Sequence, residues 1–303
     1  MRLTHRAVLG VTTLVTAVAL SGCSGDGGGN DGAAGDRGRP SAVFQAIRTA
    51  VEKTGEARTA EVELTVSMPG VTGGETRMSG VLGWEPAVMD VTVTGGALGP
   101  GKGPDRTRML LVDEVMYVHL GEEAGETFGV GPWVKTDFRA MAEKTGAEWP
   151  AESSVNGLLG MGRSPAHQMA LLLDSPDIER IGEETVDGVV TEHYGGTLTM
   201  EEALEADSSS GRLASEEREE MLDAMEKAGV EGFDIEVWVD ERDRPVRIDM
   251  EMDGPEGTIA VSQTYDDYGV PVSVEAPPAD ETTDLVEVFE RLSGRDDEGI
   301  GGV

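Results

Sequence analysis

The chain has few of the residue types on which many folds and binding sites depend. Its 303 residues include a single cysteine, Cys23, so no disulfide can form within the chain. Aromatic residues make up only 4 % of the sequence, so any hydrophobic core must be built from Val, Leu, Met and Ala. Basic residues are also scarce, with 24 Lys and Arg against 58 Asp and Glu and a formal net charge of −34. Such a chain repels phosphate backbones, which excludes a nucleic-acid partner, and we attribute the acidity to solubility.

Signatures of catalysis and cofactor binding are absent as well. The sequence has no His-Glu-x-x-His metal motif and no Gly-x-Ser-x-Gly nucleophile turn, and Gly101-Lys102-Gly103 lacks the remaining residues of a phosphate-binding loop. The pairs Asp266-Asp267 and Asp240…Asp243 lack the spacing of a calcium loop, so we expect them to be turn residues. We therefore predict a protein that is not an enzyme and has neither a cofactor nor a metal.

The histidines do not form a predicted site. No two of those beyond residue 22 have metal-ligand spacing, and we expect each to be a surface residue of a strand or helix: His119, His167 and His193.

The residues before Cys23 have the pattern of a targeting segment. Basic residues lie within Met1–Arg6, an apolar run follows over Val8–Leu20, and small residues then precede Cys23. This is the order of a secretory signal peptide, and the apolar run is too short to span a hydrocarbon layer of about 30 Å as a mature helix.

The sequence Leu20-Ser21-Gly22-Cys23 resembles the lipobox of bacterial lipoproteins. The resemblance implies that residues 1–22 are removed and that the Cys23 thiol carries a diacylglyceryl group. The protein would then be extracytoplasmic, anchored to the outer face of the cell membrane by two acyl chains, which suffice for stable anchoring. The alternative is an ordinary secreted protein with an unpaired thiol.

Composition and periodicity divide the remaining chain into three parts. Residues 23–40 comprise the lipidated cysteine and a flexible Gly- and Asp-rich tether with a root-mean-square reach of about 22 Å. Residues 41–293 form one folded domain, and residues 294–303 form a disordered polar tail. Apolar residues at helical spacing predict helices over 41–54, 164–173, 213–228 and 284–292.

Alternating apolar and polar residues predict the strands. A two-residue hairpin turn is predicted at Asp187-Gly188 and another at Asp113-Glu114. Because the strands follow one another without regular helical crossovers, we expect an α+β fold with a meandering antiparallel sheet that has one apolar face. The predicted strands cover residues 61–68, 78–84, 89–93, 108–112, 115–120, 133–135, 178–186, 189–199, 235–239, 246–252 and 259–265.

Several of these segments resemble a known family. The lipobox, the tether, the hairpin around Tyr194-Gly195-Gly196-Thr197-Leu198 and the turns near Arg244-Pro245 and Tyr268-Gly269 are similar to the LppX/LprG-type actinobacterial lipoproteins, which share the fold of the LolA and LolB lipoprotein carriers. The resemblance implies a single large curved sheet, a half-barrel, packed over a few helices with an apolar cavity for acyl chains. The acidic insertion 201–227 departs from the typical member.

Two functions stay open at this point. In the first, the protein binds or carries a lipid or acyl chain in a cavity between the curved sheet and the helices, where each buried methylene contributes about 0.8 kcal/mol. In the second, the sheet face is fully packed and the domain is a sensory or interaction module for another envelope protein. Methionines on the strands suit an adaptable apolar surface, but they could equally fill a core that has few aromatics. The predicted ligand-lining residues are Val62, Leu64, Val66, Leu82, Met89, Val91, Leu171, Leu172, Val237, Ile248 and Met250.

Overall fold

The computed structural model describes residues 42–68, 75–95, 105–137, 139–140, 164–209 and 215–287. The predicted signal peptide, Cys23, the tether and the tail lie outside these ranges, as does residue 41. In the described part, no helix is long and apolar enough to cross a membrane.

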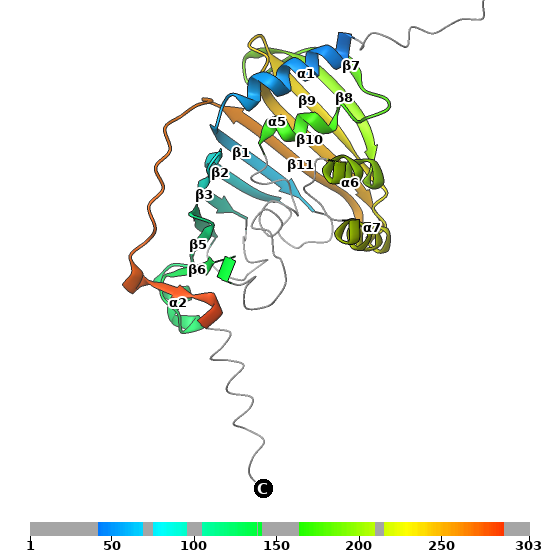
Figure 1. The fold of residues 1–303 in the computed structure, drawn as a ribbon. Coiled ribbons are helices and arrows are strands. Elements are labelled where there is room, and N and C mark those ends of the chain that lie inside the picture. Colours follow the sequence, from blue (N-terminus) through cyan, green and yellow to red (C-terminus); the bar gives the residue numbers. More distant parts are fainter. Residues whose placement is uncertain are drawn as a thin grey trace, which may run out of the picture. The chain divides into compact units, whose positions relative to one another are not determined.

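One twelve-stranded sheet organises the described domain (Figure 1). The strand order is β12-β6-β5-β4-β3-β2-β1-β11-β10-β9-β8-β7, and every neighbouring pair is antiparallel except β12 with β6. The prediction of a single, curved and essentially antiparallel sheet is therefore confirmed. The strands are β1 (Thr59–Ser67), β2 (Glu75–Trp84), β3 (Ala87–Thr94), β4 (Arg106–Val112), β5 (Val115–His119), β6 (Trp133–Asp137), β7 (Glu179–Val186), β8 (Val189–Thr199), β9 (Gly232–Asp240), β10 (Pro245–Gly254), β11 (Gly257–Asp266) and β12 (Thr282–Asp284).

The predicted turns hold the antiparallel neighbours in register. Asp113 and Glu114 have φ of 53° and 63°, and Asp187 and Gly188 have φ of 51° and 87°. Two successive residues with positive φ make the tight turn whose twist matches that of the paired strands. Asp240 accepts hydrogen bonds from the backbone N–H groups of Arg242 and Arg244, both at 2.9 Å, which confirms its expected place in a turn.

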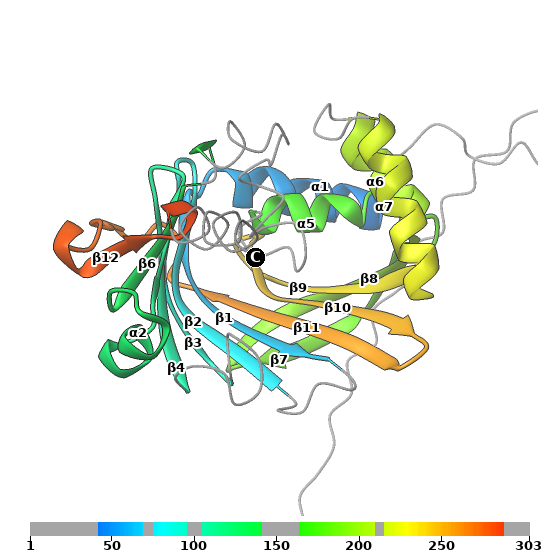
Figure 2. The ribbon, with the colours of Figure 1, turned by 90° about the horizontal axis from the view of Figure 1, so that it is seen from below.

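α1 and α5 lie on one face of the sheet, which we call the inner face (Figure 2). The predicted first, second and third helices are confirmed as α1 (Ala42–Gly55), α5 (Pro165–Leu171) and α7 (Ser215–Ala228). Ser164 caps α5, because its hydroxyl accepts from the backbone N–H of His167 at 3.2 Å. α1 packs on α5, and both lie on the concave side of the curved sheet.

Among the described residues, two α-helices, a short 3-10 helix over Ala279–Glu281 and one strand were not predicted. α2 (Glu122–Phe128) and α6 (Met200–Ser209) are helices in acidic segments with little apolar periodicity. α6 nevertheless buries Ala203 and Leu204, so part of the acidic insertion packs into the domain. β12 is three residues long, pairs in parallel with β6 and ends at Asp284, the first residue of the predicted last helix. Residues 285–287 are helical, and the rest of that predicted helix lies outside the described residues.

Candidate functional site

All eleven predicted lining residues come together on the inner face, as part of one hydrophobic cluster or packed against it. We call these eleven residues the inner wall. Nine of them are at most 8 % exposed, while Leu171 and Met250 are partly buried at its border. The register explains their convergence, because Leu64 on β1 lies opposite Met78 on β2, and Met89 on β3 lies opposite Leu82 on β2. Strand alternation therefore predicted which strand residues share the face that α1 and α5 cover.

Methionines extend the wall beyond the predicted set. Met78 and Met116 are buried, and Met109 and Met252 pack against the same cluster. Their flexible, polarizable side chains fit irregular apolar surfaces. The wall therefore runs across strands of both halves of the sheet, from β4 and β5 to β9.

A buried polar cluster interrupts the apolar inner face beneath α5. Gln168 of α5 and Gln263 of β11 exchange two amide hydrogen bonds of 3.2 and 3.1 Å, and the Tyr265 hydroxyl donates to Gln263 Oε1 at 2.9 Å. Burial raises the pKa of Tyr265 well above its usual range, because the phenolate would be desolvated there. The cluster is a polar attachment point between the helix and the sheet.

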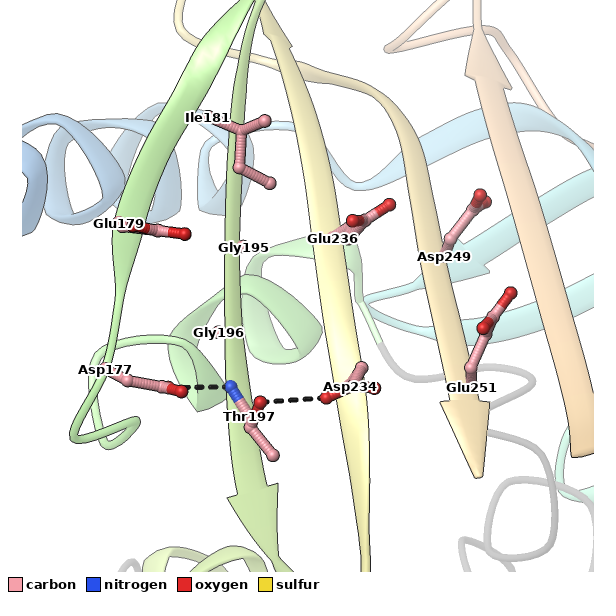
Figure 3. Close-up of a pocket in the computed structure, with 10 residues that line it drawn as sticks. All are labelled: Asp177, Glu179, Ile181, Gly195, Gly196, Thr197, Asp234, Glu236, Asp249 and Glu251. Atoms are coloured by element: carbon pink, nitrogen blue, oxygen red, sulfur yellow. Dashed lines mark hydrogen bonds between the residues drawn. The ribbon is translucent and has the colours of Figure 1, made fainter. Parts of the chain in front are cut away.

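The opposite, outer face carries a shallow acidic groove with a volume of about 460 Å³ (Figure 3). Two rows of side chains cross the strands there. The first row runs Glu179, Gly195, Glu236, Asp249, and the second runs Thr197, Asp234, Glu251, with Asp177 beside Thr197. Within the described residues, no group of three His, Cys, Asp or Glu side chains is arranged to hold a metal ion.

Thr197 organises one end of this groove. Its backbone N–H donates to Asp177 Oδ1 at 2.8 Å, and its hydroxyl donates to Asp234 Oδ1 at 2.8 Å. The pKa of Asp177 lies below its usual range, chiefly because of the Thr197 N–H and then the Ser175 hydroxyl, since both donate to the ionised form.

His193 was expected on the surface, and that expectation is wrong. Its side chain is 6 % exposed on the outer face of β8, stacked on Trp238 with ring centroids 4.1 Å apart. His193 Nδ1 lies 3.1 Å from Glu184 Oε1, and the Trp238 indole N–H donates to Glu184 Oε2 at 3.0 Å. The stack buries the imidazole because an aromatic ring and the Arg247 guanidinium, 4.9 Å from the Trp238 ring centroid, cover this face. The alternating pattern of β8 could not reveal it, since the ring occupies an outward position.

No protein-family model matches the chain. Two curated proteins are similar to it in sequence. An uncharacterised 31.2 kDa protein of Streptomyces griseus is 28 % identical over 255 residues, covering 81 % of this chain and 80 % of its own length. A Streptomyces coelicolor protein named as a candidate lipoprotein is 26 % identical over 314 residues, covering 94 % of this chain and 96 % of its own length.

Two solved lipoprotein structures are similar to this one. LprF from Mycobacterium bovis has a TM-score of 0.47 at 15 % identity, and the match covers 78 % of this chain and 97 % of LprF. The Mycobacterium tuberculosis lipoprotein LppX has a TM-score of 0.46 at 13 % identity, with coverage of 77 % and 98 %.

Proposed function

We propose that the protein is a membrane-anchored lipoprotein that binds or carries a lipid or acyl chain at the inner wall. The observation that carries the proposal is the convergence of apolar side chains from both halves of the sheet on one concave face. The candidate-lipoprotein name of the Streptomyces coelicolor relative and the lipobox-like sequence ending at Cys23 support the anchor. No step of bond making or breaking is needed for this role.

Entry of a ligand requires a movement, because the wall is covered by the protein's own side chains. α5 covers part of the wall and would have to move, which breaks the hydrogen bonds between Gln168 and Gln263. It is seven residues long and its buried residues include Met169, while Leu172 follows directly after it. An acyl chain that takes their place and buries about eight methylenes gains about 6 kcal/mol of gross transfer free energy, which offsets the loss of the helix contacts.

The second candidate is a packed sensory or interaction module for an envelope protein. The low exposure of nine wall residues, which the protein's own side chains cover, favours this alternative. The two candidate functions differ in whether the inner wall binds a lipid ligand.

Ligand recovery separates the candidates. The protein purified without detergent is extracted with organic solvent, and the extract is analysed by mass spectrometry. We expect stoichiometric lipid from the wild-type protein and a several-fold loss from Met250→Trp, which adds bulk at the half-buried border of the wall. The matched control is Val190→Trp, because Val190 is 59 % exposed. Equal recovery from both variants, or none from the wild-type protein, would reject the carrier role.

The anchor is tested separately by fractionation. We expect Cys23→Ala to move the protein from the membrane fraction to the soluble fraction and to remove the mass of a diacylglyceryl group. A variant that stays bound to the membrane would contradict the lipobox interpretation without bearing on the inner wall.

A further inference from the structure

The outer-face groove has a floor without a side chain between acidic walls. Gly195 of β8 pairs with Glu179 on β7 and with Glu236 on β9, and Asp249 follows on β10 (Figure 3). Neighbouring strands are about 4.8 Å apart, so Glu179 and Glu236 stand roughly two strand spacings from each other across Gly195. A Cβ built on Gly195 would lie 2.8 Å from the Ile181 Cδ1 atom and 3.6 Å from the Glu236 Cγ atom. The missing side chain of Gly195 thus leaves room for the end of the Ile181 side chain, which lies over it.

The charges of the groove are only partly compensated. Arg247 donates to Asp249 at 2.8 Å, and Thr197 donates to both Asp177 and Asp234. For Glu179 and Glu251, no Lys or Arg partner is recorded in the part of the chain that the structure describes. Carboxylates this close repel one another, so the groove favours a bound cation.

His193 supplies an independent sign that a donor is missing. Its Nδ1 faces the Glu184 carboxylate, which only accepts hydrogen bonds when ionised, so this contact assigns the ring hydrogen to Nδ1. In this tautomer the Nε2 atom is a bare acceptor. It is buried, has no hydrogen-bond partner, and lies 3.6 Å from Glu236 Oε2 at the groove wall. Two acceptors that face each other without a donor between them are unfavourable.

An ammonium group satisfies both acceptors at once. Because Nε2 is buried, the ammonium group reaches it when the 46 % exposed Glu236 side chain turns aside, and it then donates one N–H to Nε2 and another to the carboxylate. The remaining carboxylates accept a second ammonium group along the groove. Ile181, which is 47 % exposed and lines the groove, offers apolar contact to a methylene chain.

We propose that the outer-face groove binds an aliphatic polyamine, with one ammonium group seated between His193 Nε2 and Glu236 and the chain lying over Gly195. The proposal does not depend on the inner wall. The ligand class follows from the need for several N–H donors on an apolar stem, since the described residues hold no arrangement suited to a metal ion.

Spermidine binding to the full-length protein in uncharged detergent micelles tests the proposal by isothermal titration calorimetry at physiological salt. We expect one saturable site. Gly195→Ala should weaken binding by at least about tenfold, because its Cβ would push the Ile181 side chain into the groove without changing any charge. Its Cβ meets only the end of the flexible Ile181 side chain, so the fold should persist, as judged by the melting temperature.

A second pair of variants tests the negative charge of Glu236, since each variant replaces one glutamate by glutamine. Glu236→Gln should also weaken binding by about tenfold, as expected when one charge-assisted hydrogen bond is lost. Glu63→Gln removes the same charge from an exposed position on β1 and should leave the affinity within about twofold of the wild-type value. Equal weakening by both glutamine variants would show a diffuse counterion effect and overturn the site.

Three further outcomes would also overturn the proposal. These are unchanged binding in Gly195→Ala, displacement of spermidine by equimolar Ca²⁺, and tighter binding of a lysine-rich peptide than of spermidine.

Nitrogen NMR of His193 provides a readout within the site. We expect one protonated ring nitrogen in the free protein and a shift of Nε2 on adding spermidine. Two protonated nitrogens at neutral pH would refute the argument, because Glu236 would then have its donor within the protein.

Discussion

Gln168→Met is expected to destabilise the domain by leaving a buried amide without its partner. The substitution removes both amide hydrogen bonds between Gln168 and Gln263 while Met preserves the approximate volume of the side chain. Gln263 is 2 % exposed, so its Nε2 group cannot turn to water. One orphaned buried polar group costs about 1–3 kcal/mol. For a domain of this size, that corresponds to a melting temperature about 2–12 °C lower.

The triple variant Gln168→Met, Gln263→Met, Tyr265→Phe should recover most of this loss, to within about 1 kcal/mol of the wild-type stability. It removes the Tyr265 hydroxyl together with both amides, so no member of the cluster is left without a partner. Urea unfolding followed by circular dichroism measures all variants. The reasoning is refuted if the triple variant is less stable than Gln168→Met, or if Gln168→Met alone costs less than about 0.5 kcal/mol.

Three other predictions concern the rest of the sheet. Burial raises the pKa of both Tyr265 and Tyr268. Their contribution to the free energy of unfolding is therefore complete below about pH 10 and is lost as the pH rises further. Ultraviolet absorbance should show both tyrosines ionising only as the protein unfolds. The pKa of Glu184 is low chiefly because the Trp238 N–H donates to it, so Trp238→Phe should raise that pKa toward the usual value in a carbon NMR titration. Gly80→Ala should cost more than about 1 kcal/mol in urea unfolding, since Gly80 has φ of 152° and a Cβ there would lie 2.2 Å from the Asp90 carbonyl oxygen.

Local sequence patterns were sufficient for most of the strands and for the choice of face. Alternation places Val62, Leu64 and Val66 on one side of β1 whatever strand lies next to it, because side chains point to opposite faces in turn. The hairpin at Asp187-Gly188 was also predictable locally, because both residues readily adopt the positive φ that its tight turn requires. The candidate lining could therefore be predicted before its neighbours were known.

Features that depend on distant partners could not be predicted. β12 is three residues long and exists because β6 offers it an edge, and its sequence has no alternation of its own. His193 occupies an outward position that is buried only because Trp238 and Glu184, from two other strands, come beside it. The groove likewise joins residues of four strands, and the order of these strands in the sheet cannot be derived from local sequence patterns.

The pairing of β1 with β11 has a consequence for how the chain folds. Each half of the sheet is built mainly from neighbouring hairpins, whereas Val62 meets Tyr265 across this seam, about two hundred positions later in the chain. Such distant contacts form late and slow the search for the native state. β1 and β11 cannot pair until residue 265 has been synthesised. A nascent chain therefore stays incompletely folded through most of translation. Only an unfolded or incompletely folded polypeptide can pass through a narrow translocation pore.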